Sequence, residues 1–307
     1  MFKVMCSFPL TEEDLTELES VSKEYRFVFE KETDADIILG NVPAATLKDY
    51  PDLKWFQSCA VGIDSYIRKG VLNDGVILTN AVAVHTKPVA EHTLALILEL
   101  TKKLYRYRDD QARHLWVNEG PVKEYGDMKV CIVGFGNIGN SLARMLKALG
   151  MYTIGVKRRM IEKPEYLDEL YTDKDLIKAI SDVDVVVTIL PGNSENAGLF
   201  TLDTFRAMRP DTIMVNVGRG NLYSEETLKE VLDKKIIAAI ASDVFLKEPL
   251  DGNSPLWDHR DLVITPHVAG GYHTKSSKKA FVKLCKENLL RFINNEELKN
   301  VVSQRED

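Results

Sequence analysis

The sequence predicts an α/β protein made of two doubly wound parallel-sheet domains with an active-site cleft between them. Its length of 307 residues fits two domains at roughly 150 residues each. Short apolar strands alternate with amphipathic segments both before and after the stretch NEGPVKEYGD (118–127). In the second half, a glycine-rich turn directly follows a strand, which is typical of doubly wound sheets.

The expected strands of the first half are short apolar runs, and one amphipathic helix interrupts them. The strands are FKVMC (2–6), FVFE (27–30), ADIILG (35–40), LKWFQSC (53–59) and GVILTN (75–80), and the helix is TEEDLTELESV (11–21). A single long helix is expected over residues 88–113, crossing from one domain to the other. Residues 274–298 form an amphipathic helix with Phe281, Cys285 and Leu289 on one face.

The second half repeats the alternation of strands and helices. Strands are expected at residues 129–134, 152–156, 184–191, 212–218, 236–244 and 262–266, and helices at 140–150, 173–181 and 224–234. All of these strands are predicted to lie in one parallel sheet, whose carboxyl edge is where ligands bind in such folds.

Composition restricts the function classes. The net charge is −6, so no basic surface dominates and nucleic acid is not an expected partner. No apolar run is long enough to span a bilayer, and the first residues do not resemble a signal peptide. The four cysteines show no CxxC pair and the histidines no metal-ligand spacing. We therefore expect a cytoplasmic protein without disulfides, metal or membrane partner.

The stretch VCIVGFGNIG (130–139) indicates a dinucleotide site, because Gly134, Gly136 and Gly139 lie between a β-branched strand and a helix. The first glycine permits a tight turn, the second lets the backbone approach a pyrophosphate, and the third allows close helix packing. The helix start, which includes Asn137 and Ile138, offers free N–H groups to phosphate. The pattern predicts a Rossmann domain.

The second strand of this domain ends without the expected acid. In the NAD type of the fold, an Asp or Glu at this place accepts hydrogen bonds from the adenosine ribose. Here Lys157, Arg158 and Arg159 follow the strand, and the next carboxylate is Glu162. Cations attract a ribose 2′-phosphate, and arginine binds phosphate oxygens with two N–H donors. The stretch predicts NADP(H) as cofactor, with NAD possible; a solvated basic loop is the alternative.

Three downstream loops follow predicted strands: NVGRG (216–220), SDVFLKEPL (242–250) and TPHVAGG (265–271). Together with VGFGNIG (133–139), AVGIDS (60–65) and VAEHTLALIL (89–98), they closely resemble the D-isomer-specific 2-hydroxyacid dehydrogenase family. The resemblance covers nearly the whole chain in the right order. It implies a discontinuous, flavodoxin-like substrate domain of residues 1–95 and 274–307, a Rossmann cofactor domain of residues 96–273, and a homodimer.

The resemblance implies that Arg219 binds the substrate carboxylate and the reacting carbonyl, that His267 donates and accepts the proton, and that Glu248 partners His267. The chemistry requires the same residue types. Reducing a 2-oxo acid leaves negative charge on the C2 oxygen, so a protonated imidazole must supply a proton while a fixed cation holds the carboxylate. A carboxylate beside the imidazole keeps it protonated at neutral pH.

Further site residues follow from the resemblance. Asp243 matches the position that hydrogen-bonds the nicotinamide carboxamide, and the backbone N–H groups of Val61 and Gly62 match those that hold the substrate carboxylate. The remaining expected cofactor contacts are Pro191, Val217, Gly218 and Gly270. One departure is Asn196, which stands where the family commonly has a threonine, so the cofactor contact from that loop is in doubt.

The sequence thus predicts an NADPH-dependent reductase that converts a small 2-oxo acid, such as glyoxylate or hydroxypyruvate, to the D-2-hydroxy acid. Two alternatives stay open. One is the NAD-dependent form of the same reaction, and the other is a non-catalytic NAD(P)H-sensing regulatory protein on the same scaffold, because fold alone does not separate these functions.

Overall fold

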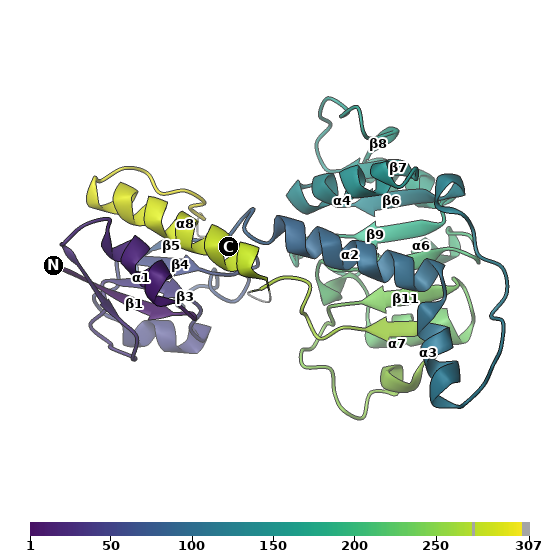
Figure 1. The fold of residues 1–307 in the computed structure, drawn as a ribbon, viewed down its shortest axis with the longest axis horizontal. Helices are drawn as coiled ribbons and strands as arrows, with labels where there is room; N and C mark the ends of the chain where they lie inside the picture. The colour runs from purple at the N-terminus through teal and green to yellow at the C-terminus, as the bar shows by residue number, and fades with distance from the viewer. Residues whose placement is uncertain (272–273, 303–307) are drawn as a thin grey trace. The chain divides into compact units, whose positions relative to one another are not determined.

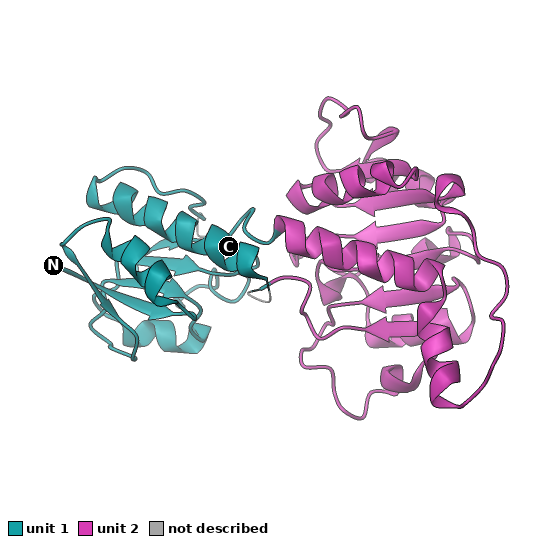
Figure 2. Ribbon diagram, in the orientation of Figure 1, with its two compact units in different colours: residues 1–85, 271–307 teal, residues 86–270 magenta. Residues whose placement is uncertain are grey.

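The computed structural model describes residues 1–271 and 274–302, and Figure 2 shows its two compact units. The first unit consists of Met1–His85 and Gly271–Asp307, and the second of Thr86–Gly270. Each unit is built on one sheet whose strands all run parallel. The predicted fold class is confirmed.

The five-stranded sheet of the first unit has the order β2-β1-β3-β4-β5 (Figure 1). Its strands are β1 (Phe2–Ser7), β2 (Tyr25–Val28), β3 (Ile37–Gly40), β4 (Trp55–Ser58) and β5 (Ile77–Thr79). Successive residues of β1 face opposite sides, so Val4 packs with Leu18 and Phe281 while Met5 packs with Leu47. Helices α1 (Glu12–Glu19) and α8 (Lys275–Ile293) therefore cover one face.

The seven-stranded sheet of the second unit has the order β12-β11-β10-β9-β6-β7-β8, the doubly wound order with a switch point between β6 and β9. Its strands are β6 (Lys129–Val133), β7 (Tyr152–Lys157), β8 (Glu169–Thr172), β9 (Val185–Thr188), β10 (Ile213–Asn216), β11 (Ala239–Ser242) and β12 (Leu262–Ile264). The interiors of the five central strands are buried on both faces, as parallel sheets require, whereas the edge strands β8 and β12 are only partly buried.

Helices cover both faces of this sheet (Figure 1). Alternate residues of β6 separate the two cores: Val130 and Ile132 pack on the side of α2 (Thr86–Thr101) and α4 (Asn137–Ala148). Cys131 and Val133 pack on the other side, with α5 (Leu176–Ile180), α6 (Leu202–Arg206) and α7 (Glu225–Asp233).

The prediction of a single helix over residues 88–113 is wrong. The chain forms α2 and then α3 (Leu104–Ala112), and between them Lys103 adopts a left-handed backbone with φ of 56°. The break buries Tyr105 and lets Arg106 pair with Asp261 at 2.5 Å. Both helices belong to the second unit, because α2 packs along its length on α4, β10 and β11.

The unit boundaries differ slightly from those expected. The first segment of the first unit ends at His85 rather than at residue 95, because α2 packs on the helix and strands of the second unit. The expected boundary after residue 273 lies at residues outside the described part of the chain. Strand β8 was not predicted, because this half-buried edge strand carries no apolar run. Within the described residues, no helix has the length and apolar character needed to cross a bilayer.

Candidate active site

The glycine-rich turn joins β6 to α4 as predicted. Gly134 has φ of +102°, and a Cβ there would lie 2.5 Å from the Ile189 carbonyl oxygen, so only glycine fits. A Cβ on Gly139 would lie 3.0 Å from Ile132 Cγ2, which shows how closely the helix packs on its strand. By contrast, a Cβ on Gly136 would meet no atom of the described residues within 4 Å. Because no side chain in the described part of the chain caps α4 at Gly136, the first N–H groups of this helix are open to an anion.

The three cations after β7 have different environments. Lys157 is half-buried, and its Nζ donates to the carbonyl oxygen of Phe135 in the glycine-rich turn at 3.3 Å. Arg158 is exposed and pairs through Nη2 with Glu195 Oε2 at 2.6 Å. Arg159 is exposed and forms no ion pair with the described residues. The sequence has no acid directly after β7, but the structure brings a carboxylate to this corner, because Glu195 of the loop after β9 pairs with Arg158.

The loop after β10 carries Arg219 and is fixed by its neighbours. The buried side chain of Asn216 accepts from Gly218 N–H at 3.1 Å and donates to the Arg219 carbonyl oxygen at 3.1 Å. Arg219 Nη1 donates to the Gly218 carbonyl oxygen at 2.8 Å. A Cβ on Gly192 would lie 3.0 Å from Arg219 Cγ, so the aliphatic part of the arginine lies against this glycine.

His267 lies on a turn that a buried carboxylate holds. Asp243, only 1% exposed, accepts from Thr265 Oγ1 at 2.5 Å and Val268 N–H at 2.9 Å through Oδ1, and from Ala269 N–H at 3.0 Å through Oδ2. The backbone carbonyl of Asp243 accepts from His267 N–H at 2.8 Å. His267 itself has φ of 53°. This is a left-handed backbone conformation, which a residue other than glycine rarely adopts unless its surroundings impose it.

Glu248 joins this turn to the loop after β11. Its Oε2 lies 2.6 Å from His267 Nδ1, and its Oε1 accepts from the Phe245 backbone N–H at 2.9 Å. The His267 side chain is about half exposed at 48%, so the ring is accessible on its other side. The Arg219 loop touches the same segment, because a Cβ on Gly220 would lie 1.9 Å from the Phe245 carbonyl carbon. The three predicted loops therefore meet at the carboxyl edge of one sheet.

Two supporting groups were missed by the sequence analysis. Tyr223 Oη accepts from Asn216 Nδ2 at 3.0 Å and lies 3.2 Å from Ser242 Oγ, which ties the loop after β10 to the end of β11. His92 of α2 places Nε2 at 3.2 Å from Thr265 Oγ1 and 3.8 Å from Asp243 Oδ1. Tyr223 has no characteristic spacing in the sequence, and although His92 lies in VAEHTLALIL (89–98), that stretch does not indicate its contact with Thr265.

The other predicted residues lie on loops. Val61 and Gly62 belong to the first unit, and within residues 1–271 and 274–302 neither backbone N–H donates a hydrogen bond. Asn196 is buried, and its Nδ2 donates to the Pro191 carbonyl oxygen at 2.9 Å, so its amide closes the loop after β9. Val217 and Gly218 are buried, and a Cβ on Gly218 would lie 2.6 Å from the backbone nitrogen of Leu190 in that loop. Gly270 is the last residue of the second unit.

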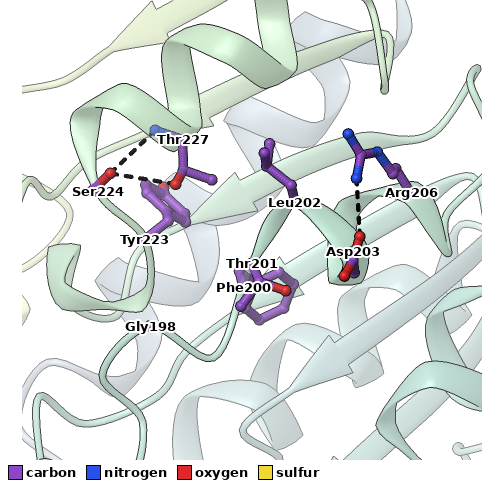
Figure 3. Close-up of a pocket in the computed structure, with 9 residues that line it drawn as sticks. All are labelled: Gly198, Phe200, Thr201, Leu202, Asp203, Arg206, Tyr223, Ser224 and Thr227. Atoms are coloured by element: carbon purple, nitrogen blue, oxygen red, sulfur yellow. Dashed lines mark hydrogen bonds and ion pairs between the residues drawn. The ribbon is translucent and has the colours of Figure 1, made fainter.

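A hollow elsewhere on the second unit is lined in part by Tyr223 and by none of the predicted site residues. It lies beside α6 and α7, where Asp203 pairs with Arg206 at 2.9 Å and Ser224 Oγ accepts from Thr227 N–H at 3.1 Å (Figure 3). Among the described residues, no three acidic, cysteine or histidine side chains are grouped to hold a metal. Burial raises the pKa of the Cys6 thiol to about 12, which disfavours a thiolate there.

Comparisons with known proteins agree with this geometry. Residues 94–269 match the profile of the D-isomer specific 2-hydroxyacid dehydrogenase, NAD binding domain. Glyoxylate/hydroxypyruvate reductase B of Shigella boydii is 28% identical over 279 residues, covering 88% of this chain and 85% of the relative. The chain belongs to the D-isomer specific 2-hydroxyacid dehydrogenase family, which confirms the family, the oxidoreductase class and the dinucleotide-binding domain expected from the sequence.

Two solved structures extend the similarity to nearly the full chain. A D-isomer specific 2-hydroxyacid dehydrogenase family protein from Aeromonas salmonicida superposes with a TM-score of 0.88 at 27% identity, covering 99% of both chains. The NADPH-dependent glyoxylate/hydroxypyruvate reductase of Sinorhizobium meliloti, solved with NADP and sulfate, gives 0.84 at 25% identity, again covering 99% of both.

The two glycines at the dinucleotide turn should respond differently to a methyl group. Gly134→Ala places its Cβ against the Ile189 carbonyl at positive φ, so we expect a loss of about 1–3 kcal/mol in the free energy of unfolding. Gly136→Ala meets open space and should change stability by less than about 1 kcal/mol. Urea unfolding monitored by circular dichroism measures both. Equal destabilisation by the two variants would contradict the observed packing of the turn.

Proposed function

We propose that this protein is an NADPH-dependent reductase of small 2-oxo acids, such as glyoxylate or hydroxypyruvate, that forms the D-2-hydroxy acid. The pairing of His267 Nδ1 with Glu248 Oε2 at 2.6 Å, at the carboxyl edge of a doubly wound sheet, carries the proposal. The names of the Shigella and Sinorhizobium relatives support the substrate class.

The bound dinucleotide would supply the hydride. Gly134, Gly136 and Gly139, with Asn137 and Ile138, would bind its pyrophosphate, because Gly136 leaves space and the start of α4 offers N–H groups. Arg158 and Arg159 would bind the 2′-phosphate, and Lys157 would stabilise the glycine-rich turn through its hydrogen bond to the Phe135 carbonyl oxygen. Contacts from Pro191, Val217, Gly218 and Gly270 stay predictions.

The chain's own groups account for substrate binding and proton transfer. Glu248 Oε2 lies 2.6 Å from Nδ1 of His267 and orients the ring, which leaves Nε2 to transfer the proton to the C2 oxygen. Arg219 would hold the substrate carboxylate as a fixed cation. The open N–H groups of Val61 and Gly62 are proposed as further carboxylate donors. Asp243 fixes the turn that carries His267, and its predicted contact with the nicotinamide carboxamide stays a prediction.

The direct test is dinucleotide oxidation with a panel of 2-oxo acids. We expect NADPH to be oxidised with glyoxylate or hydroxypyruvate faster than with pyruvate or a branched 2-oxo acid, and the product to be the D-isomer. Absorbance at the nicotinamide band and chiral analysis of the product give both readouts. If neither NADPH nor NADH is oxidised with any member of the panel, the proposed enzyme function is wrong and the regulatory alternative gains support.

The role of Glu248 is tested by the effect of its carboxylate on the rate. Glu248→Gln removes the charged partner of His267 Nδ1, so the ring is held less firmly in the orientation that proton transfer needs. We expect kcat for glyoxylate reduction to fall by about tenfold or more, with the dissociation constant for NADPH within about threefold of the wild type. The exposed Glu165→Gln serves as the control. A kcat equal to that of the control would remove Glu248 from this role.

We also propose a homodimer, the assembly that the family resemblance implies. The segment after α3 exposes Trp116 fully and leaves Leu115 and Val117 about half exposed. Glu119 in the same segment pairs with Arg106 and Arg260, so the segment is anchored to the sheet domain. Exposed tryptophan on an anchored segment is typical of contact surfaces between protein chains.

A further inference from the structure

We propose that Glu195 sets the balance between NADPH and NADH, by occupying Arg158 when no 2′-phosphate is present and by acting as the ribose-binding acid for NADH. The inference rests on the proposed function and adds to it: the protein would use both cofactors, with Glu195 restraining its preference for NADPH. The sequence shows no acid at the end of β7, and the structure supplies one from the loop after β9.

The order of strands explains how the two side chains meet. Arg158 follows β7 and Glu195 lies on the loop after β9, and both strands flank β6 in the sheet. Neighbouring strands lie about 4.8 Å apart, so two long side chains can span the end of β6. That strand leads into the glycine-rich turn. The 2.6 Å pair between Arg158 and Glu195 therefore reaches across the strand that begins the dinucleotide site.

Glu195 is held in place by its loop. The next residue, Asn196, is buried, and its Nδ2 binds the Pro191 carbonyl oxygen while its backbone N–H donates to Asn193 Oδ1 at 3.0 Å. The carboxylate itself is 66% exposed and the Arg158 side chain 57% exposed. Ion pairs this exposed contribute little to stability, so the pair can open when a better partner for the arginine arrives.

The two cofactors use this pair differently. A 2′-phosphate carries more charge and more acceptor oxygens than a carboxylate, so it displaces Glu195 from Arg158 and gains bidentate hydrogen bonds. The nearby negative charge of Glu195 then opposes the phosphate. With NADH there is no phosphate, and the carboxylate of Glu195 can accept hydrogen bonds from the ribose hydroxyls, as the acid at the end of the second strand does in NAD-type folds.

Direct binding of NADPH and NADH to the whole protein, measured by isothermal titration calorimetry, tests the proposal without turnover. Glu195→Ala should tighten NADPH binding by about threefold to tenfold and weaken NADH binding by about tenfold. Arg158→Gln should weaken NADPH binding by about tenfold or more and change NADH binding by less than about threefold. Both side chains are exposed, so neither change should affect folding.

Glu162→Ala is the matched control, because Glu162 is an exposed acid on the same segment as Arg158 and removing it makes the same change in net charge. We expect it to leave the ratio of the two dissociation constants within about twofold of the wild type. If Glu195→Ala changes both constants by the same factor, or only as much as Glu162→Ala does, Glu195 is not the determinant. If the wild-type protein binds neither dinucleotide, the proposed function fails as well.

Discussion

The geometry of the candidate site depends on the carboxylate of Asp243. This group is almost completely buried, and three donors from the 265–269 turn converge on its two oxygens. A buried charge is tolerated when hydrogen bonds satisfy it, and here the same bonds hold His267 in a left-handed backbone conformation. The Asp243 side chain thus fixes the backbone that carries His267, although it makes no hydrogen bond to the imidazole ring.

The parallel sheet makes this arrangement possible. Strands β10, β11 and β12 are neighbours and run in the same direction, so the loops that carry Arg219, Glu248 and His267 leave the sheet at one edge. Polar contacts then fix the loops to each other. The buried side chains of Asn216, Tyr223 and Ser242 connect the first loop to the second, and Glu248 connects the second to the third. The glycine-rich turn opens at the same edge, after β6.

Sequence alone predicted what depends on local pattern. The strand, glycine turn and helix at 129–148 and the three loop motifs all lie where expected, because apolar periodicity and glycine spacing act over a few residues. What it missed depends on contacts between distant segments. Glu195 pairs with Arg158 through sheet order, and His92 meets Thr265 from a helix far away in the chain. The break at Lys103 was hidden because tertiary contacts of Tyr105 and Arg106 impose it on a helical pattern.

The central claim is that His267 transfers the proton, while the other residues of the site bind the dinucleotide and the substrate. Replacing His267 by Asn keeps a polar side chain of smaller size, and asparagine also tolerates the left-handed backbone. The most direct measurement compares kcat for glyoxylate reduction with the dissociation constant for NADPH in this variant. The account predicts a fall in kcat of about a hundredfold or more with NADPH affinity within about threefold of the wild type. A variant that retains kcat would contradict it.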